Sequence, residues 1–286
     1  MNRKKNILTL FCLALIGFFS SCSGDKPIDS VRTDSTHDTM SAQPVNDSLR
    51  NKFKKLVSAM PVPFDMLQQF SGAHLPFKGE LLNKPERVSS YNQADQQSLN
   101  LGIYGADLAY MISQNKLGES APYLKCVHQL SDLIVVPTAF DIKMMQRWDA
   151  NQDQQDSLGT LLERSYKKID STLQGNDRLI LATLVITGGW TEGIYLTTQH
   201  IGDEKQNEKN KVLFDMLSMQ HQDVQNISDL LGSFPQDKTC SELHGDFEKL
   251  KTLFPGPNVS ADEFSVQLKD LRESIAEIRN HLISVQ

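Results

Sequence analysis

Two acidic residues stand in unusually similar surroundings in this chain. Asp107 lies within the segment GIYGADLAY and Glu192 within GGWTEGIY, and both segments are rich in glycine and aromatic residues. A carboxylate inside an apolar helix must be paired, protonated or used in chemistry, because burial disfavours its charged form. If both carboxylates face one cavity, they predict a site for a cation or a polar ligand, or an acid/base pair.

A packing explanation competes with that prediction. Glycine inside a helix costs about 1 kcal/mol relative to alanine, and close approach of two helix backbones is a common reason for accepting that cost. The glycines concerned are Gly102, Gly105, Gly188, Gly189 and Gly193. In this alternative the two acids pair with Arg147 or Arg178, or accept hydrogen bonds from tyrosine hydroxyls, and no ligand is involved.

Four aromatic residues complete the candidate ligand-binding set. Tyr104, Tyr110, Trp190 and Tyr195 flank the two acids in sequence and could line a groove for a glycan or a peptide. Core packing of the same rings is the alternative. The chain contains no HExxH, GxSxG or Walker-type pattern, so we assign no catalytic residue, metal ligand or cofactor and expect a non-catalytic protein.

The elements that position these residues are helical. Apolar residues recur at spacings of three and four from about residue 47 onward, and alternating strand patterns are absent. The pattern predicts helices over 94–113, 120–135, 153–173, 179–201, 213–231, 243–254 and 262–283, with a short one near 64–70 in an otherwise irregular stretch. Asp177 is the expected N-cap of the helix over 179–201, and Ser260 with Glu263 forms a capping box.

The predicted fold is therefore all-α, a multi-helix bundle or helical-hairpin array of about eight helices. The helix over 179–201 is apolar on most sides and should be central. A weak internal sequence similarity aligns Asp107 with Glu192 and Tyr110 with Tyr195, which suggests the hypothesis that the domain consists of two duplicated halves.

The N-terminus predicts a lipoprotein. Three basic residues precede a short apolar run over 7–19, and two serines stand before Cys22. The run is too short to cross a bilayer as a helix, so we expect cleavage before Cys22 and acylation of that residue, including palmitate. A secretory signal with an incidental cysteine is the alternative. The expected organisation is a signal peptide over 1–21, an acylated cysteine and flexible tether over 22–47, and one helical domain over 48–286.

Charge and cysteine content limit the partners. Loss of the signal would remove three cations and change the formal net charge from −6 to −9, which makes nucleic acid a poor partner. We expect a lipid-anchored protein of the cell envelope, at the periplasmic face of the outer membrane or at the cell surface, that binds an envelope protein or a small polar ligand. Cys126 and Cys240 remain in the domain, where two buried thiols are favoured over a disulfide.

Several motifs carry a resemblance to a known group. The N-terminal signal, the segments NLGIYGADLAY and GGWTEGIYLTTQ, the AFD at 139–141 and the ANQD at 150–153 resemble an uncharacterised family of all-helical lipoproteins from Bacteroidota. The resemblance covers about residues 50–285. It implies an envelope location and an all-α fold, and it implies no catalytic motif or substrate.

Overall fold

The computed structural model describes residues 47–59, 66–67, 69–71, 75–134, 136, 139–175, 177–254 and 261–284. Within these ranges the chain forms α-helices and short 3-10 helices and contains no strand, which confirms the all-α prediction. The signal peptide, Cys22 and the tether lie outside the described residues. So do Ser260, the side chain of Glu263, and positions 64, 65 and 68 of the short helix expected near 64–70.

The helices follow one another with short connections. The α-helices are α1 (Asp47–Ser58), α3 (Ala94–Ser113), α4 (Ala121–Leu133), α5 (Ile142–Asp149), α6 (Gln155–Gly175), α7 (Leu179–Ile201), α8 (Lys211–Ser218), α9 (His221–Leu231), α10 (Lys238–Leu250) and α11 (Ala261–Ile283). The 3-10 helices are η1 (Gln69–Ser71), η2 (Gly79–Leu81), η3 (Pro85–Ser90), η4 (Leu117–Glu119) and η5 (Lys251–Leu253).

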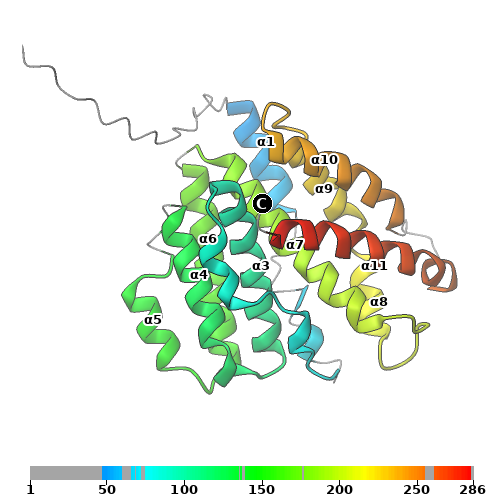
Figure 1. Ribbon diagram of the computed structural model, residues 1–286, viewed down its shortest axis with the longest axis horizontal. Helices are drawn as coiled ribbons and strands as arrows, with labels where there is room; N and C mark the ends of the chain where they lie inside the picture. The colour runs from blue at the N-terminus through cyan, green and yellow to red at the C-terminus, as the bar shows by residue number, and fades with distance from the viewer. Residues whose placement is uncertain are drawn as a thin grey trace, which may run out of the picture. The chain divides into compact units, whose positions relative to one another are not determined.

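Helix α7 is the central element, as its sequence predicts. It contacts α3, α6, α8, α9 and α11, so neighbours cover it on several sides (Figure 1). In the described part of the chain it is also the helix that is long and apolar enough to cross a membrane, but 83% of its most apolar window is buried within the protein. Such burial is typical of a core helix, whose apolar surface packs against other helices instead of lipid.

Two glycines allow α3 and α7 to lie against each other with their backbones almost in contact. A β-carbon on Gly102 would stand 2.1 Å from the carbonyl oxygen of Val185, and one on Gly188 would stand 2.0 Å from that of Leu99. Both distances are far below van der Waals contact, so neither position accepts a larger side chain without separating the helices. The glycines at these positions are therefore required by helix packing.

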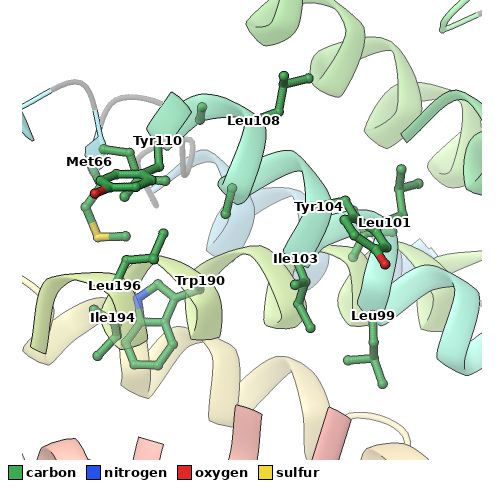
Figure 2. Packing of buried hydrophobic residues seen from close by; sticks show 14 of the residues in the cluster. Met66, Leu99, Leu101, Ile103, Tyr104, Leu108, Tyr110, Trp190, Ile194 and Leu196 are labelled. Atoms are coloured by element: carbon green, nitrogen blue, oxygen red, sulfur yellow. The ribbon is translucent and has the colours of Figure 1, made fainter. Parts of the chain in front are cut away.

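The two helices run parallel. Gly102 meets α7 near Gly188, and closer to the C-terminal ends of both helices the Tyr110 hydroxyl is bonded to His200. Figure 2 shows the same direction, with residues 99 to 110 of α3 advancing toward the side on which Ile194 and Leu196 of α7 lie. This parallel register brings Asp107 and Glu192 to the same level of the interface.

Two local predictions are wrong, and one helix was not predicted. The single helix expected over 213–231 is broken into α8 and α9, and at the break the buried Gln220 accepts a hydrogen bond from Trp190 Nε1 at 2.9 Å. Asp177 does not cap α7, because it adopts a φ of 57° and its carboxylate pairs with Arg50 instead. Helix α5 was not expected; Asp141 caps it by accepting a hydrogen bond from the backbone N–H of Met144 at 2.8 Å.

Candidate functional site

A buried ion pair lies at the level where Asp107 and Glu192 meet. Arg279 of α11 donates from Nε to Glu192 Oε2 at 2.9 Å and from Nη2 to Glu192 Oε1 at 3.0 Å. The Glu192 side chain is fully buried and Arg279 is 5% exposed. The two parallel hydrogen bonds give the bidentate geometry in which an arginine and a carboxylate interact most strongly. Glu192 is therefore neutralised by a cation from α11.

Asp107 joins this pair as its third member. Its Oδ2 accepts a hydrogen bond from the backbone N–H of Asn83 at 3.1 Å, and its side chain lies close enough to Glu192 for the two carboxyl groups to interact. Burial, and then the charge of Glu192, raise the pKa of Asp107 well above its usual 3.8, although Arg279 acts in the opposite direction. Asp107 Oδ1 is buried and has no hydrogen-bond partner that is already a donor, and two carboxyl groups can share a hydrogen bond only when one of them is protonated. We therefore assign the proton to Asp107 Oδ1, which donates to Glu192.

The cluster of Asp107, Glu192 and Arg279 is consequently close to electrically neutral. Arg279 also donates from Nη2 to the carbonyl of Leu81 at 3.0 Å, and its guanidinium lies 4.6 Å from the ring centre of Tyr195. Burial alone would lower the pKa of Arg279, but the neighbouring Glu192 and Asp107 outweigh it and raise that pKa further. Arg279 is thus held as a cation with contacts on several sides.

Residues 83–91, which include η3, are hydrogen-bonded to the helices around the cluster. The Asn83 side-chain amide donates to the Tyr91 hydroxyl at 3.1 Å and to Asn100 Oδ1 at 3.2 Å. Asn100 Nδ2 in turn donates to the carbonyl of Leu282 at 3.0 Å, near the end of α11. These hydrogen bonds connect residues 83–91 with α3 and α11 next to the acid cluster. Both carboxylates are fully buried, and none of the three surface hollows found among the described residues is lined by either acid.

The four aromatic candidates do not gather in one groove. Tyr104 is buried and donates to the carbonyl of Lys84 at 2.8 Å, whereas Trp190 packs against Phe247 and Phe254 on another side of the core. Figure 2 shows Tyr104 and Trp190 separated along the interface of α3 and α7. Tyr195 is the aromatic candidate that reaches the acid cluster, through Arg279.

Tyr110 belongs to a separate group of rings. Its hydroxyl accepts from the backbone N–H of Lys78 at 2.9 Å and lies 2.8 Å from His200 Nε2. Burial, and then the charge of Lys78, lower the pKa of His200 to about 4. The imidazole is therefore neutral near pH 7 and shares a hydrogen bond with the Tyr110 hydroxyl through Nε2. Phe70 and Phe77 pack on this pair.

The expected cation partners of the acids are wrong. Arg147 lies on α5 and lines an exposed hollow, and Arg178 donates to the carbonyl of Ile134 at 2.6 Å. Arg279 is the partner that the sequence analysis missed. A signal was present, because Arg279 lies four residues after Ile275 and three before Leu282 and so falls on the apolar face of its helix. An arginine on such a face needs a buried acid.

The remaining candidate groups are isolated. Cys126 and Cys240 are buried free thiols, and burial raises the pKa of both, that of Cys126 to about 12. Across the described ranges no three His, Cys, Asp or Glu side chains are placed to hold a metal ion.

Comparison with known proteins adds no relative: no family model, curated protein or solved structure matches the chain. The resemblance to helical lipoproteins of Bacteroidota stays a prediction from the quoted motifs. The geometry of the buried cluster is therefore the main basis for a functional argument.

Proposed function

We propose that this protein is a lipid-anchored lipoprotein of the cell envelope whose helical domain is a non-catalytic interaction or ligand-binding module. In this proposal Cys22 carries the acyl chains, including palmitate, residues 22–47 are the tether, and residues 48–286 are the domain. The anchor holds the protein at the periplasmic face of the outer membrane or at the cell surface. The domain is a helical bundle, and the parallel contact of α3 with α7 is compatible with duplicated halves.

The proposal that the domain is non-catalytic rests on the complete burial of Asp107 and Glu192. Asp107 and Glu192 are fully buried and interact with each other, and Arg279 forms two hydrogen bonds with Glu192. A general acid or base must come within hydrogen-bond reach of the substrate. These carboxylates have no such access and instead join α3, α7 and α11. A structural role accounts for their position without a substrate.

The competing proposal is an envelope enzyme or cation-binding protein that uses the same pair. The raised pKa of Asp107 favours it, because shifted pKa values are common among catalytic acids. Structural networks shift pKa values as well, however, and a bound cation would have to displace Arg279 from Glu192. We therefore prefer the non-catalytic proposal.

The lipid anchor is tested by metabolic labelling with a tagged palmitate in cells that express the full chain. We expect label on the wild-type protein, recovery in the membrane fraction, and loss of both in Cys22→Ala. A Cys126→Ser variant is the matched control, because it removes a cysteine from the domain and should keep the label. An unlabelled wild-type protein, or label that persists in Cys22→Ala, would contradict the anchor.

The role of the domain is tested by in-cell cross-linking of the tagged protein with Asp107→Asn as a parallel sample. The substitution can preserve both hydrogen bonds of Asp107 while removing its acid function. We expect the same cross-linked envelope species with both proteins. Their loss in Asp107→Asn, with folding intact by circular dichroism, would favour the enzyme or cation-binding alternative.

A further inference from the structure

Helices α5 and α6 enclose two adjoining surface hollows, which we call the α5–α6 cleft. The first has a volume of about 280 Å³ and the second about 330 Å³. Arg147, Leu161 and Arg164 line both hollows, so the two form a continuous feature. Figure 1 shows α5 as a short helix at the edge of the fold, and it packs against α6.

Four cations surround this cleft. Lys143 and Arg147 come from α5, and Arg164 and Lys168 come from α6; all four side chains are exposed. None of them makes an ion pair with any part of the chain that the structure describes. The cleft therefore concentrates positive charge on a chain whose formal net charge is −6.

Many of the basic residues elsewhere on the described helices have an acidic partner. Lys167, the immediate neighbour of Lys168, pairs with Glu163, and Arg272 pairs with Asp203. Many other lysines on its helices also have an acid three or four residues away, including Lys211, Lys238, Lys249, Lys251 and Lys269. Unpaired like charges around one hollow repel one another, and an anion bound there would relieve that repulsion.

The acids of the cleft leave a net positive charge. The Asp141 carboxylate lines the first hollow but is engaged as the N-cap of α5. Asp156 lines the second hollow in the first turn of α6. Two carboxylates therefore face four cations.

The floor of the cleft is apolar and fixed in place. Ala139, Met144 and Leu161 line it, and Met144 is 8% exposed. Trp148 on the next turn is buried and anchors α5 to the core. A ligand could therefore place a short apolar part on this floor while its charged group meets the arginines.

We propose that the α5–α6 cleft binds a phosphate-bearing anion, with Arg147 and Arg164 as the principal contacts and Lys143 and Lys168 at the rim. Guanidinium groups match phosphate oxygens in paired hydrogen bonds, and lysines add point charges. This inference deepens the ligand-binding role and rests on the proposed function. The phosphate can come from the headgroup of an anionic phospholipid or from a water-soluble phosphate ester.

The test is isothermal titration calorimetry on the full chain purified in a nonionic detergent. The probes are inorganic phosphate, glycerol 1-phosphate, short-chain phosphatidylglycerol and, as a zwitterionic reference, short-chain phosphatidylcholine. We expect saturable, salt-sensitive binding of at least one anionic probe and weaker binding of the zwitterionic one. Binding of glycerol 1-phosphate identifies a soluble ester as sufficient, and binding confined to phosphatidylglycerol identifies the lipid headgroup.

Variants separate a built site from general charge attraction. Arg147→Gln with Arg164→Gln should weaken binding about tenfold or more, because two charge-assisted contacts are lost. The matched control is Lys54→Gln with Lys55→Gln, which removes the same charge from exposed positions of α1 and should leave affinity within about twofold.

Two results would overturn the inference: no saturable binding of any anionic probe, or equal weakening in both double variants. Lys143→Gln with Lys168→Gln provides a second test if the arginine variant folds poorly. Palmitate labelling does not depend on the cleft. A labelled protein that binds no anion would therefore refute the cleft and leave the proposed lipoprotein intact.

Discussion

The assigned proton on Asp107 makes a quantitative prediction about stability and pH. In the folded protein Oδ1–H donates to Glu192 and Oδ2 accepts from Asn83. Asparagine has nearly the same shape: its amide nitrogen can donate to Glu192 and its oxygen can accept from Asn83. Asp107→Asn should therefore preserve the network without requiring a bound proton.

The magnitude follows from proton linkage. The unfolded chain releases the Asp107 proton above a pKa near 3.8, whereas burial raises the pKa of this residue in the folded state. Folding then takes up one proton, so the stability contributed by this group is complete at low pH and declines as pH rises toward the folded-state pKa. At any pH between the unfolded-state and folded-state pKa values, the decline is about 1.4 kcal/mol per pH unit.

Urea unfolding followed by tryptophan fluorescence measures this effect. The free energy of unfolding of the full chain and of Asp107→Asn is determined at pH 5, 6 and 7, and the difference between the two proteins is plotted against pH. Subtraction removes the contributions of other titrating groups that are common to both. We expect the free energy of unfolding of Asp107→Asn, relative to that of the wild type, to increase by about 1.4 kcal/mol for each unit by which the pH is raised.

A flat difference would refute the assignment, because it would mean that Asp107 has the same protonation in the folded and unfolded states over this range. Marked destabilisation of Asp107→Asn at pH 7 would also refute it, since an ionised Asp107 would then be making contacts that an amide cannot replace.

Three further predictions concern the same core. Glu192→Gln should lower the free energy of unfolding by about 3 kcal/mol in urea titrations, because Arg279 would remain buried without a carboxylate; an unchanged midpoint would contradict the ion pair. Gly188→Ala should lower the free energy of unfolding by about 2 kcal/mol or more in the same urea titrations. Gly245→Ala is the control, because a β-carbon there meets no atom within 4 Å, and its free energy of unfolding should be unchanged or slightly higher. Equal effects of the two substitutions would disprove the close approach of α3 and α7. Because the folded-state pKa of His200 is lowered to about 4, its imidazole should destabilise the fold as pH falls from 6.5 toward 4, and its NMR titration should show a midpoint near 4 and not near 6.5.

Much of the helical architecture was readable from local sequence. The spacing of apolar residues predicted α3 over 94–113 and α7 over 179–201 with their observed bounds, and it predicted that α7 is central. The prediction from local sequence failed where a helix ends although the helical spacing of apolar residues continues. It joined α8 to α9, because no glycine or proline marks the break where Gln220 turns to accept the Trp190 hydrogen bond.

The candidate site was predictable in part. Sequence reasoning selected Asp107 and Glu192 because a charge within an apolar, glycine-rich helix must be compensated, and the fold brings the two together. It also connected the glycines with close helix packing, which the contacts of Gly102 and Gly188 bear out. It chose the wrong cation, since the compensating Arg279 lies 87 residues beyond Glu192.

The sequence by itself determined which segments become helices and which of their faces are apolar, because helical hydrogen bonds and amphipathic spacing depend on residues within a few turns. Only the tertiary structure decided that α3 and α7 run parallel, that Arg279 neutralises Glu192, and that Asp107 keeps its proton. Those outcomes depend on which side chains meet after packing and on how completely water is removed around them. They also decide that Arg147 and Arg164, which form no ion pair within the described part of the chain, line an open cleft together.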